Sequence, residues 1–105
     1  MDSTKLKELI VDVLCDKKAE DIVSLSVAEK TIMSDFFVIC TGRSTTQVKA
    51  LVQSVEDKLE EDGIFVTRKE GVREGRWAVL DYGSVIVHIF NSDTRDFYAL
   101  EKLWK

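Results

Sequence analysis

The chain has 105 residues, a length typical of one domain, and it carries 15 Lys and Arg against 19 Asp and Glu, for a formal charge of −4. Hydrophobic residues make up 45% and charged residues 32%, a composition typical of compact globular proteins. Tandem arrays and multidomain architectures are excluded. We expect residues 1–105 to form a single domain whose core needs neither a metal ion nor a disulfide.

The acidic balance bears on the kind of partner. Affinity for bare nucleic acid grows with the number of phosphates that a protein neutralises, so an acidic chain is poorly suited to bind nucleic acid. A basic protein is a more favourable partner for it. Residues 68–76 are a local exception, with four Lys or Arg against two Glu. They are either a solvated turn or a site of direct RNA contact.

Nothing in the sequence indicates export or a membrane. Residues 1–5 lack the apolar stretch of a signal peptide, and the predicted first helix is acidic as well as basic, unlike a transit peptide. Every apolar run is far shorter than the ~20 residues that a membrane-spanning helix needs. We therefore expect a cytoplasmic protein.

The residues that carry chemistry are few and scattered. Cys15, on an expected helix face, and Cys40, in an expected buried strand, are predicted to be small buried hydrophobes. His88 is the only histidine and CxxC spacing is absent, so the sequence predicts no metal site and no cofactor. Because His88 lies in a strand with apolar neighbours, we expect a sheet histidine bonded to a neighbour rather than a general base.

The first half of the chain predicts helix, strand, strand and helix. Ser3 caps the first helix, and residues 22–27 alternate as a half-exposed strand. Residues 35–42 are apolar at consecutive positions, which is typical of a central strand covered on both faces. Ser44 opens a capping box for the second helix, which Gly63 ends. The apolar faces of the two helices comprise Leu6, Leu9, Ile10, Val13 and Leu14, and Val48, Leu51, Val52, Val55 and Leu59.

The second half predicts three more strands. Residues 64–69 form a strand that completes a βαβ unit with the strand and helix before it, so its outer strands should run parallel with a right-handed crossover. A turn at 71–75 leads to a strand at 76–81. A tight turn at 82–84 leads to a strand at 85–90, apolar on both faces. The last three strands should form a meander.

A closing helix completes the predicted fold. Ser92 caps it, and its apolar positions are Phe97, Leu100, Leu103 and Trp104. The predicted order is α-β-β-α-β-β-β-α, an α+β (mixed α/β) fold in which a five-stranded mixed sheet is flanked by helices. This topology is nucleotidyltransferase-like, and the turn at 41–44 precedes a helix N-terminus that suits a phosphate. The strand at 64–69 lacks the paired carboxylates of a two-metal site, so an enzyme is kept only as an alternative to a binding module.

One strand end groups aromatic and acidic residues. Trp77 and Val79 share one face of the strand, Leu80 lies on the other, and Asp81 and Tyr82 follow at its end. Trp and Tyr are frequent anchors of protein interfaces. Two interpretations stay open on the residues alone: a docking cluster, or a core tryptophan followed by Asp81 as a turn former.

Four segments of the chain carry a specific pattern in order. They are 34–44 (SDFFVICTGRS), 77–83 (WAVLDYG), 88–90 (HIF) and 95–104 (RDFYALEKLW). Together with Gln47-Val48 they resemble the ribosomal silencing factor family, RsfS, also called Iojap. The resemblance covers nearly the whole chain.

The resemblance implies a bacterial protein that is not an enzyme. Such a factor binds the large ribosomal subunit through the universal protein uL14 and sterically blocks the small subunit, so that translation falls when nutrients are short. The implied contacts are Trp77, Leu80, Asp81 and Tyr82 for the protein partner, with Lys69 and Arg73 near rRNA. A role in large-subunit assembly is the alternative within the family, and the exposed aromatic strands leave a homodimer of the free chain open.

Overall fold

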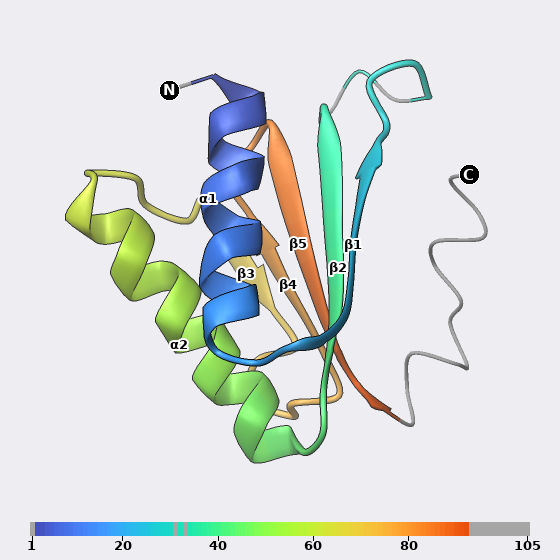
Figure 1. Ribbon diagram of the computed structural model, residues 1–105, viewed down its shortest axis with the longest axis vertical. Coiled ribbons are helices and arrows are strands. Elements are labelled where there is room, and N and C mark those ends of the chain that lie inside the picture. The colour runs from blue at the N-terminus through green and yellow to red at the C-terminus, as the bar shows by residue number, and fades with distance from the viewer. Residues whose placement is uncertain (1, 31, 33, 93–105) are drawn as a thin grey trace.

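The computed structural model describes residues 2–30, 32 and 34–92. They form two helices and a five-stranded mixed sheet, so the predicted α+β fold is confirmed (Figure 1). The predicted closing helix, apart from its cap Ser92, lies outside the described residues. The elements are α1 (Ser3–Asp16), β1 (Glu20–Ser26), β2 (Phe36–Gly42), α2 (Thr45–Glu61), β3 (Arg68–Glu70), β4 (Trp77–Asp81) and β5 (Val85–Asn91).

The order of the strands follows their hydrophobicity. The sheet runs β1-β2-β5-β4-β3, and the two most apolar strands, β2 and β5, pair in parallel inside it. Both are buried along most of their length, as their continuous apolar runs predict. The edges are β1, whose polar residues alternate with half-buried ones, and β3, whose three residues are all exposed.

The path of the chain confirms the predicted meander and refines the βαβ unit. β5, β4 and β3 are antiparallel neighbours. Since β5 runs parallel to β2, and two antiparallel steps follow, β3 runs in the same direction as β2, as predicted. The two strands are not neighbours, because β5 and β4 lie between them.

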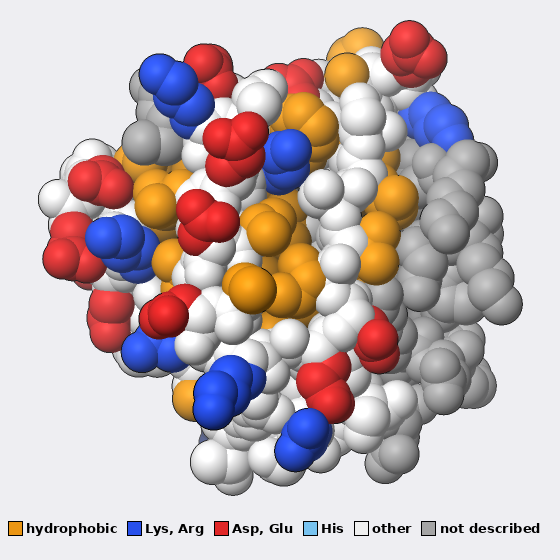
Figure 2. All heavy atoms as spheres, in the orientation of Figure 1, with side chains coloured by type: hydrophobic (Ala, Val, Ile, Leu, Met, Phe, Trp, Pro, Cys, Tyr) orange, Lys and Arg blue, Asp and Glu red, His pale blue; other side chains and the backbone are white. Residues whose placement is uncertain are grey.

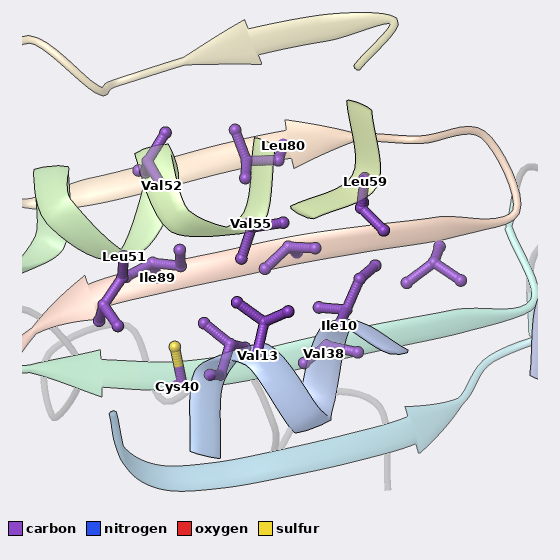
Figure 3. Packing of buried hydrophobic residues seen from close by; sticks show 14 of the residues in the cluster. Ile10, Val13, Val38, Cys40, Leu51, Val52, Val55, Leu59, Leu80 and Ile89 are labelled. Carbon is purple, nitrogen blue, oxygen red and sulfur yellow. The ribbon is translucent and has the colours of Figure 1, made fainter. Parts of the chain in front are cut away.

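Both helices pack against one face of the sheet (Figure 1). The predicted apolar positions of α1 and α2 meet the inward side chains of β2, β4 and β5 there (Figure 3). Only Leu9 among them stays partly exposed. Full burial of one such leucine or isoleucine stabilises the fold by roughly 2 kcal/mol. No helix in the described part of the chain is long and apolar enough to cross a membrane.

The ends of the helices follow local side-chain chemistry. Asp2, and not Ser3, caps α1, since its Oδ1 accepts a 2.8 Å hydrogen bond from the backbone N–H of Lys5. Ser44 caps α2 as predicted by accepting from the N–H of Gln47, while the Gln47 amide oxygen accepts from the N–H of Arg43. Gly63, at φ +74°, follows the end of α2.

Two further predictions need correction. The strand predicted at 64–69 begins only at Arg68, because Ile64 and Val66 turn toward the helix-side core and the first contact with β4 is the bond from the N–H of Thr67 to the carbonyl of Asp81. Cys15 is exposed, because it lies on the side of α1 that faces away from the sheet. Cys40 is buried, as predicted.

The opposite face of the sheet carries a second buried cluster. It contains Val27, Phe37, Ile39 and Phe90, with Leu25, Trp77 and Ile86 packed against it. The register pairs Trp77 with Phe90, Val79 with His88, and Arg68 with Asp81, so all six side chains lie on this face. We call it the Trp77 face.

Candidate functional site

The alternation of β4 divides the predicted docking residues between two sides of the sheet. Trp77, Val79 and Asp81 are half-buried on the Trp77 face, and Ala78 and Leu80 are buried under the helices. Leu80 has 0% exposure, so its predicted place in the docking surface is wrong. Its side chain supports the core because the residue following an outward position in a strand points inward.

Trp77 belongs to an aromatic cluster on its face. Its ring stacks on Phe90 across the β4–β5 pair, with centroids 5.1 Å apart and planes at 22°. The His88 ring lies 6.0 Å from Trp77 and 5.0 Å from Phe37. One side of the indole is therefore anchored in the sheet while the residue remains partly exposed.

His88 forms the polar contact of this cluster. The Nε1–H of Trp77 donates a 3.1 Å hydrogen bond to Nδ1 of His88, which confirms the prediction of a sheet histidine bonded to a neighbour. Burial lowers the pKa of His88 from its ordinary value of 6.5 to about 4, because the charged ring would lose its hydration. At neutral pH the ring is therefore uncharged.

Asp81 closes the turn that follows β4. Its Oδ1 accepts a 2.8 Å hydrogen bond from the N–H of Gly83, so its predicted role as a turn former is confirmed. Its Oδ2 lies 3.9 Å from Nη2 of Arg68, a partner that no sequence pattern indicates and that only the β3–β4 register reveals. The Asp81 side chain is 26% exposed, so part of it remains accessible at the surface.

Tyr82 lies on the helix side and not on the Trp77 face. Its ring packs against the helix-side core, and burial, followed by the nearby charges of Glu56 and Glu60 on α2, raises the pKa of its hydroxyl. The hydroxyl oxygen is buried and bonds to none of the described residues. A partner that covers Trp77 would thus contact Tyr82 only if it also extended past the end of β4 to the helix side of the sheet.

The two basic candidates, Lys69 and Arg73, differ in ion pairing and exposure. Lys69 also faces α2, where its Nζ lies 3.2 Å from Oε1 of the buried Glu56. Arg73 is exposed in the turn between Gly71 and Gly75. Of the two, Arg73 is the better placed for contact with a nucleic acid, because Lys69 already neutralises a carboxylate.

The side of the molecule covered by the helices has a different character. Figure 2 shows Asp, Glu, Lys and Arg interspersed over α1, with hydrophobic side chains between α1 and the strands. A groove of about 600 Å³ between α1 and α2 is lined by Leu9, Asp12, Val13, Asp16, Lys17, Ser54, Asp57, Lys58 and Glu61. None of the predicted docking residues lines this groove.

The turn at 41–44, which suggested the enzymatic alternative, has contacts that position and cap α2. In the turn at 41–44, Gly42 lies against the start of α2, where an added Cβ would come within 2.9 Å of Val48. Ser44 and Gln47 use their side chains as caps. Among the described residues, no group of three or more His, Cys, Asp or Glu is placed to hold a metal ion.

Comparison with known proteins identifies the family. The family model described as "Ribosomal silencing factor during starvation" matches residues 1–105. The ribosomal silencing factor RsfS of Halalkalibacterium halodurans is 41% identical over 104 residues, covering 99% of this chain and 89% of that protein. A mouse relative named mitochondrial assembly of ribosomal large subunit protein 1 is 31% identical over 100 residues, 92% of this chain and 44% of that protein.

A solved structure agrees with this assignment. The crystal structure of protein CV0518 from Chromobacterium violaceum superposes with a TM-score of 0.96 at 36% identity, covering 99% of this chain and 87% of that chain. The family inferred from the four sequence segments is thus confirmed, and with it the association with ribosomes and translation regulation. The chain belongs to the ribosomal silencing factor family, RsfS.

Proposed function

We propose that this protein binds the large ribosomal subunit through protein uL14 and prevents the small subunit from joining. The block is steric and needs no catalysis, since a folded domain on the intersubunit surface excludes the other subunit by its volume. It acts in the bacterial cytoplasm and represses translation when nutrients are limiting.

The observation that carries the proposal is the placement of Trp77 and Asp81. They lie four residues apart on one face of β4, the indole stacked on Phe90 and the carboxylate fixed by the turn to Gly83. A half-buried aromatic ring and an ordered carboxylate on the same face of one strand offer an apolar contact and a charge-assisted hydrogen bond to a Lys or Arg of the partner. This combination suits a basic ribosomal protein.

The charge of the whole chain supports the same partner. With a formal charge of −4, the domain is attracted to a basic protein surface and repelled by exposed rRNA. Long-range charge thus guides the encounter, while Trp77 and Asp81 provide the local contact.

Replacement of the proposed anchor tests the docking face. We expect Trp77→Ala to bind purified large subunits about 30-fold more weakly, because truncation of a central interface tryptophan costs about 2 kcal/mol or more. Asp81→Asn keeps the acceptor for Gly83 and removes only the charge, so it should weaken binding without opening the turn. Binding is measured by co-sedimentation, and subunit joining by light scattering.

Phe65→Ala is the matched control, since Phe65 is a 66% exposed aromatic residue that is not a member of the cluster around Trp77. It should bind and block joining like the unmodified protein. Native binding by both Trp77→Ala and Asp81→Asn would reject this docking face. Suppressed joining of mature subunits favours silencing, whereas tight binding with normal joining favours large-subunit assembly, the process named for the mouse relative.

A peripheral contact between Arg73 and rRNA is part of the proposal. Arg73→Glu should weaken large-subunit binding severalfold and reduce the slope of log affinity against log salt by about one unit, as expected for the loss of one phosphate contact. Lys49→Glu, which changes the charge equally at an exposed position of α2, should leave the slope unchanged. An unaltered slope for Arg73→Glu would remove this contact.

A further inference from the structure

Contacts of different kinds hold the indole of Trp77. Stacking on Phe90 fixes the plane of the ring. The hydrogen bond from Nε1–H to His88 fixes which edge of that plane points into the sheet. An indole turned over within the same plane would keep its stacking and lose the hydrogen bond, because hydrogen bonds are directional and ring stacking is much less so.

The chemistry of the two rings defines the proton positions. The indole nitrogen can only donate, so Nδ1 of His88 must be the acceptor and the histidine proton resides on Nε2. His88 is 7% exposed, and its Nε2 bonds to none of the described residues. The histidine therefore has one directional contact on the described part of the chain, and that contact is with Trp77.

We propose that His88 is a positioning residue that holds the Trp77 indole in one orientation for docking. The inference rests on the proposed function, because it explains how the anchor of that interface is organised before binding. A side chain ordered in the free protein loses less rotamer entropy when the partner arrives. The pyrrole N–H is consumed inside the protein, so the partner meets an indole surface that needs no acceptor.

Two variants separate the hydrogen bond from the packing. His88→Phe keeps an aromatic ring between Phe37 and Phe90 and removes the acceptor. His88→Asn keeps an acceptor, since its Oδ1 stands at the same number of bonds from Cα as Nδ1, and it loses part of the ring. If His88 acts only by packing, His88→Phe should preserve the properties of the original protein better than His88→Asn. If His88 positions the indole, His88→Asn should preserve them better.

The readout is the Nε1–H resonance of Trp77, identified by its absence in Trp77→Phe. We expect hydrogen exchange of this proton to be about five-fold faster in His88→Phe, the effect of one hydrogen bond, and to return toward the original rate in His88→Asn. In the unmodified protein a ¹⁵N–¹⁵N coupling between Trp77 Nε1 and His88 Nδ1 should be visible across the bond. This measurement needs no variant, so it tests whether the Trp77–His88 hydrogen bond exists even if His88→Phe fails to fold.

Large-subunit affinity is measured on the same variants. We expect about five-fold weaker binding for His88→Phe and recovery in His88→Asn. Absence of the coupling, or an exchange rate unaffected by His88→Phe, would overturn the proposal whatever the affinities are. If the indole loses protection but Trp77→Ala still binds ribosomes normally, the bond to His88 stands and the docking role of Trp77 is wrong.

Discussion

Gly71→Ala is expected to lower the free energy of unfolding by at least about 3 kcal/mol, one of the larger losses from a single surface-turn substitution. Gly71 has φ +73°, a conformation that costs an alanine roughly 1 kcal/mol by itself. In addition, an added Cβ would overlap the backbone carbonyl oxygen of Trp77. A backbone group cannot rotate away, so the turn or the start of β4 must shift.

The measurement is urea unfolding followed by circular dichroism, with Gly63→Ala as the matched control. Gly63 has nearly the same φ, +74°, but an added Cβ meets nothing within 4 Å. It should therefore lose only the conformational term of roughly 1 kcal/mol. Equal losses for the two variants would show that Gly71 does not pack closely against β4. A displaced β4 should also weaken large-subunit binding, because Trp77 begins that strand.

Acidification from pH 7.5 to 5.0 is expected to remove about 2 kcal/mol of stability through His88 alone. The pKa of His88 falls from 6.5 to about 4 in the folded protein because burial disfavours the charged ring. Between these values the unfolded chain binds a proton that the folded protein does not, so stability falls with decreasing pH. The contribution is fully present above pH 6.5 and is lost progressively toward pH 4.

His88→Asn removes the titrating group and should show a correspondingly flatter pH dependence in urea unfolding. The carboxylates on the same face, Glu70 and Asp81, are present in both proteins, so the difference in slope reports His88. Parallel pH profiles for the two proteins would contradict a buried neutral histidine. The acid effect also has a local consequence, since protonation of Nδ1 breaks the bond to Trp77.

Much of the fold could be predicted because it depends on residues close in sequence. The apolar spacing of α1 and α2, the cap Ser44 and the continuous apolar runs of β2 and β5 each act over a few residues. A local prediction was wrong where two neighbouring residues can both cap a helix: Asp2, rather than Ser3, caps α1. The strand predicted from residue 64 was too long, because Ile64 and Val66 satisfy their hydrophobicity against the helices instead.

The candidate site was predicted less completely. Trp77 and Asp81 follow from the pattern and share a face, but Leu80 is inside the core and Tyr82 packs on the helix side. Lys69 is paired with Glu56, a residue 13 positions away, and no local pattern in the sequence connects the two. Adjacency in sequence placed these residues in one cluster, although a strand sends alternate side chains to opposite faces.

The sequence by itself determined the element types, the two apolar helix faces, the buried strands and the membership of the ribosomal silencing factor family. Periodicity, caps and turn residues are local, and family segments are read directly from the order of residues. Only the tertiary structure decided that β5 and β4 lie between β2 and β3, that Arg68 faces Asp81, and that His88 holds Trp77. These features depend on strand pairing between distant segments, where the balance of burial over the whole chain selects one register among several locally equivalent ones.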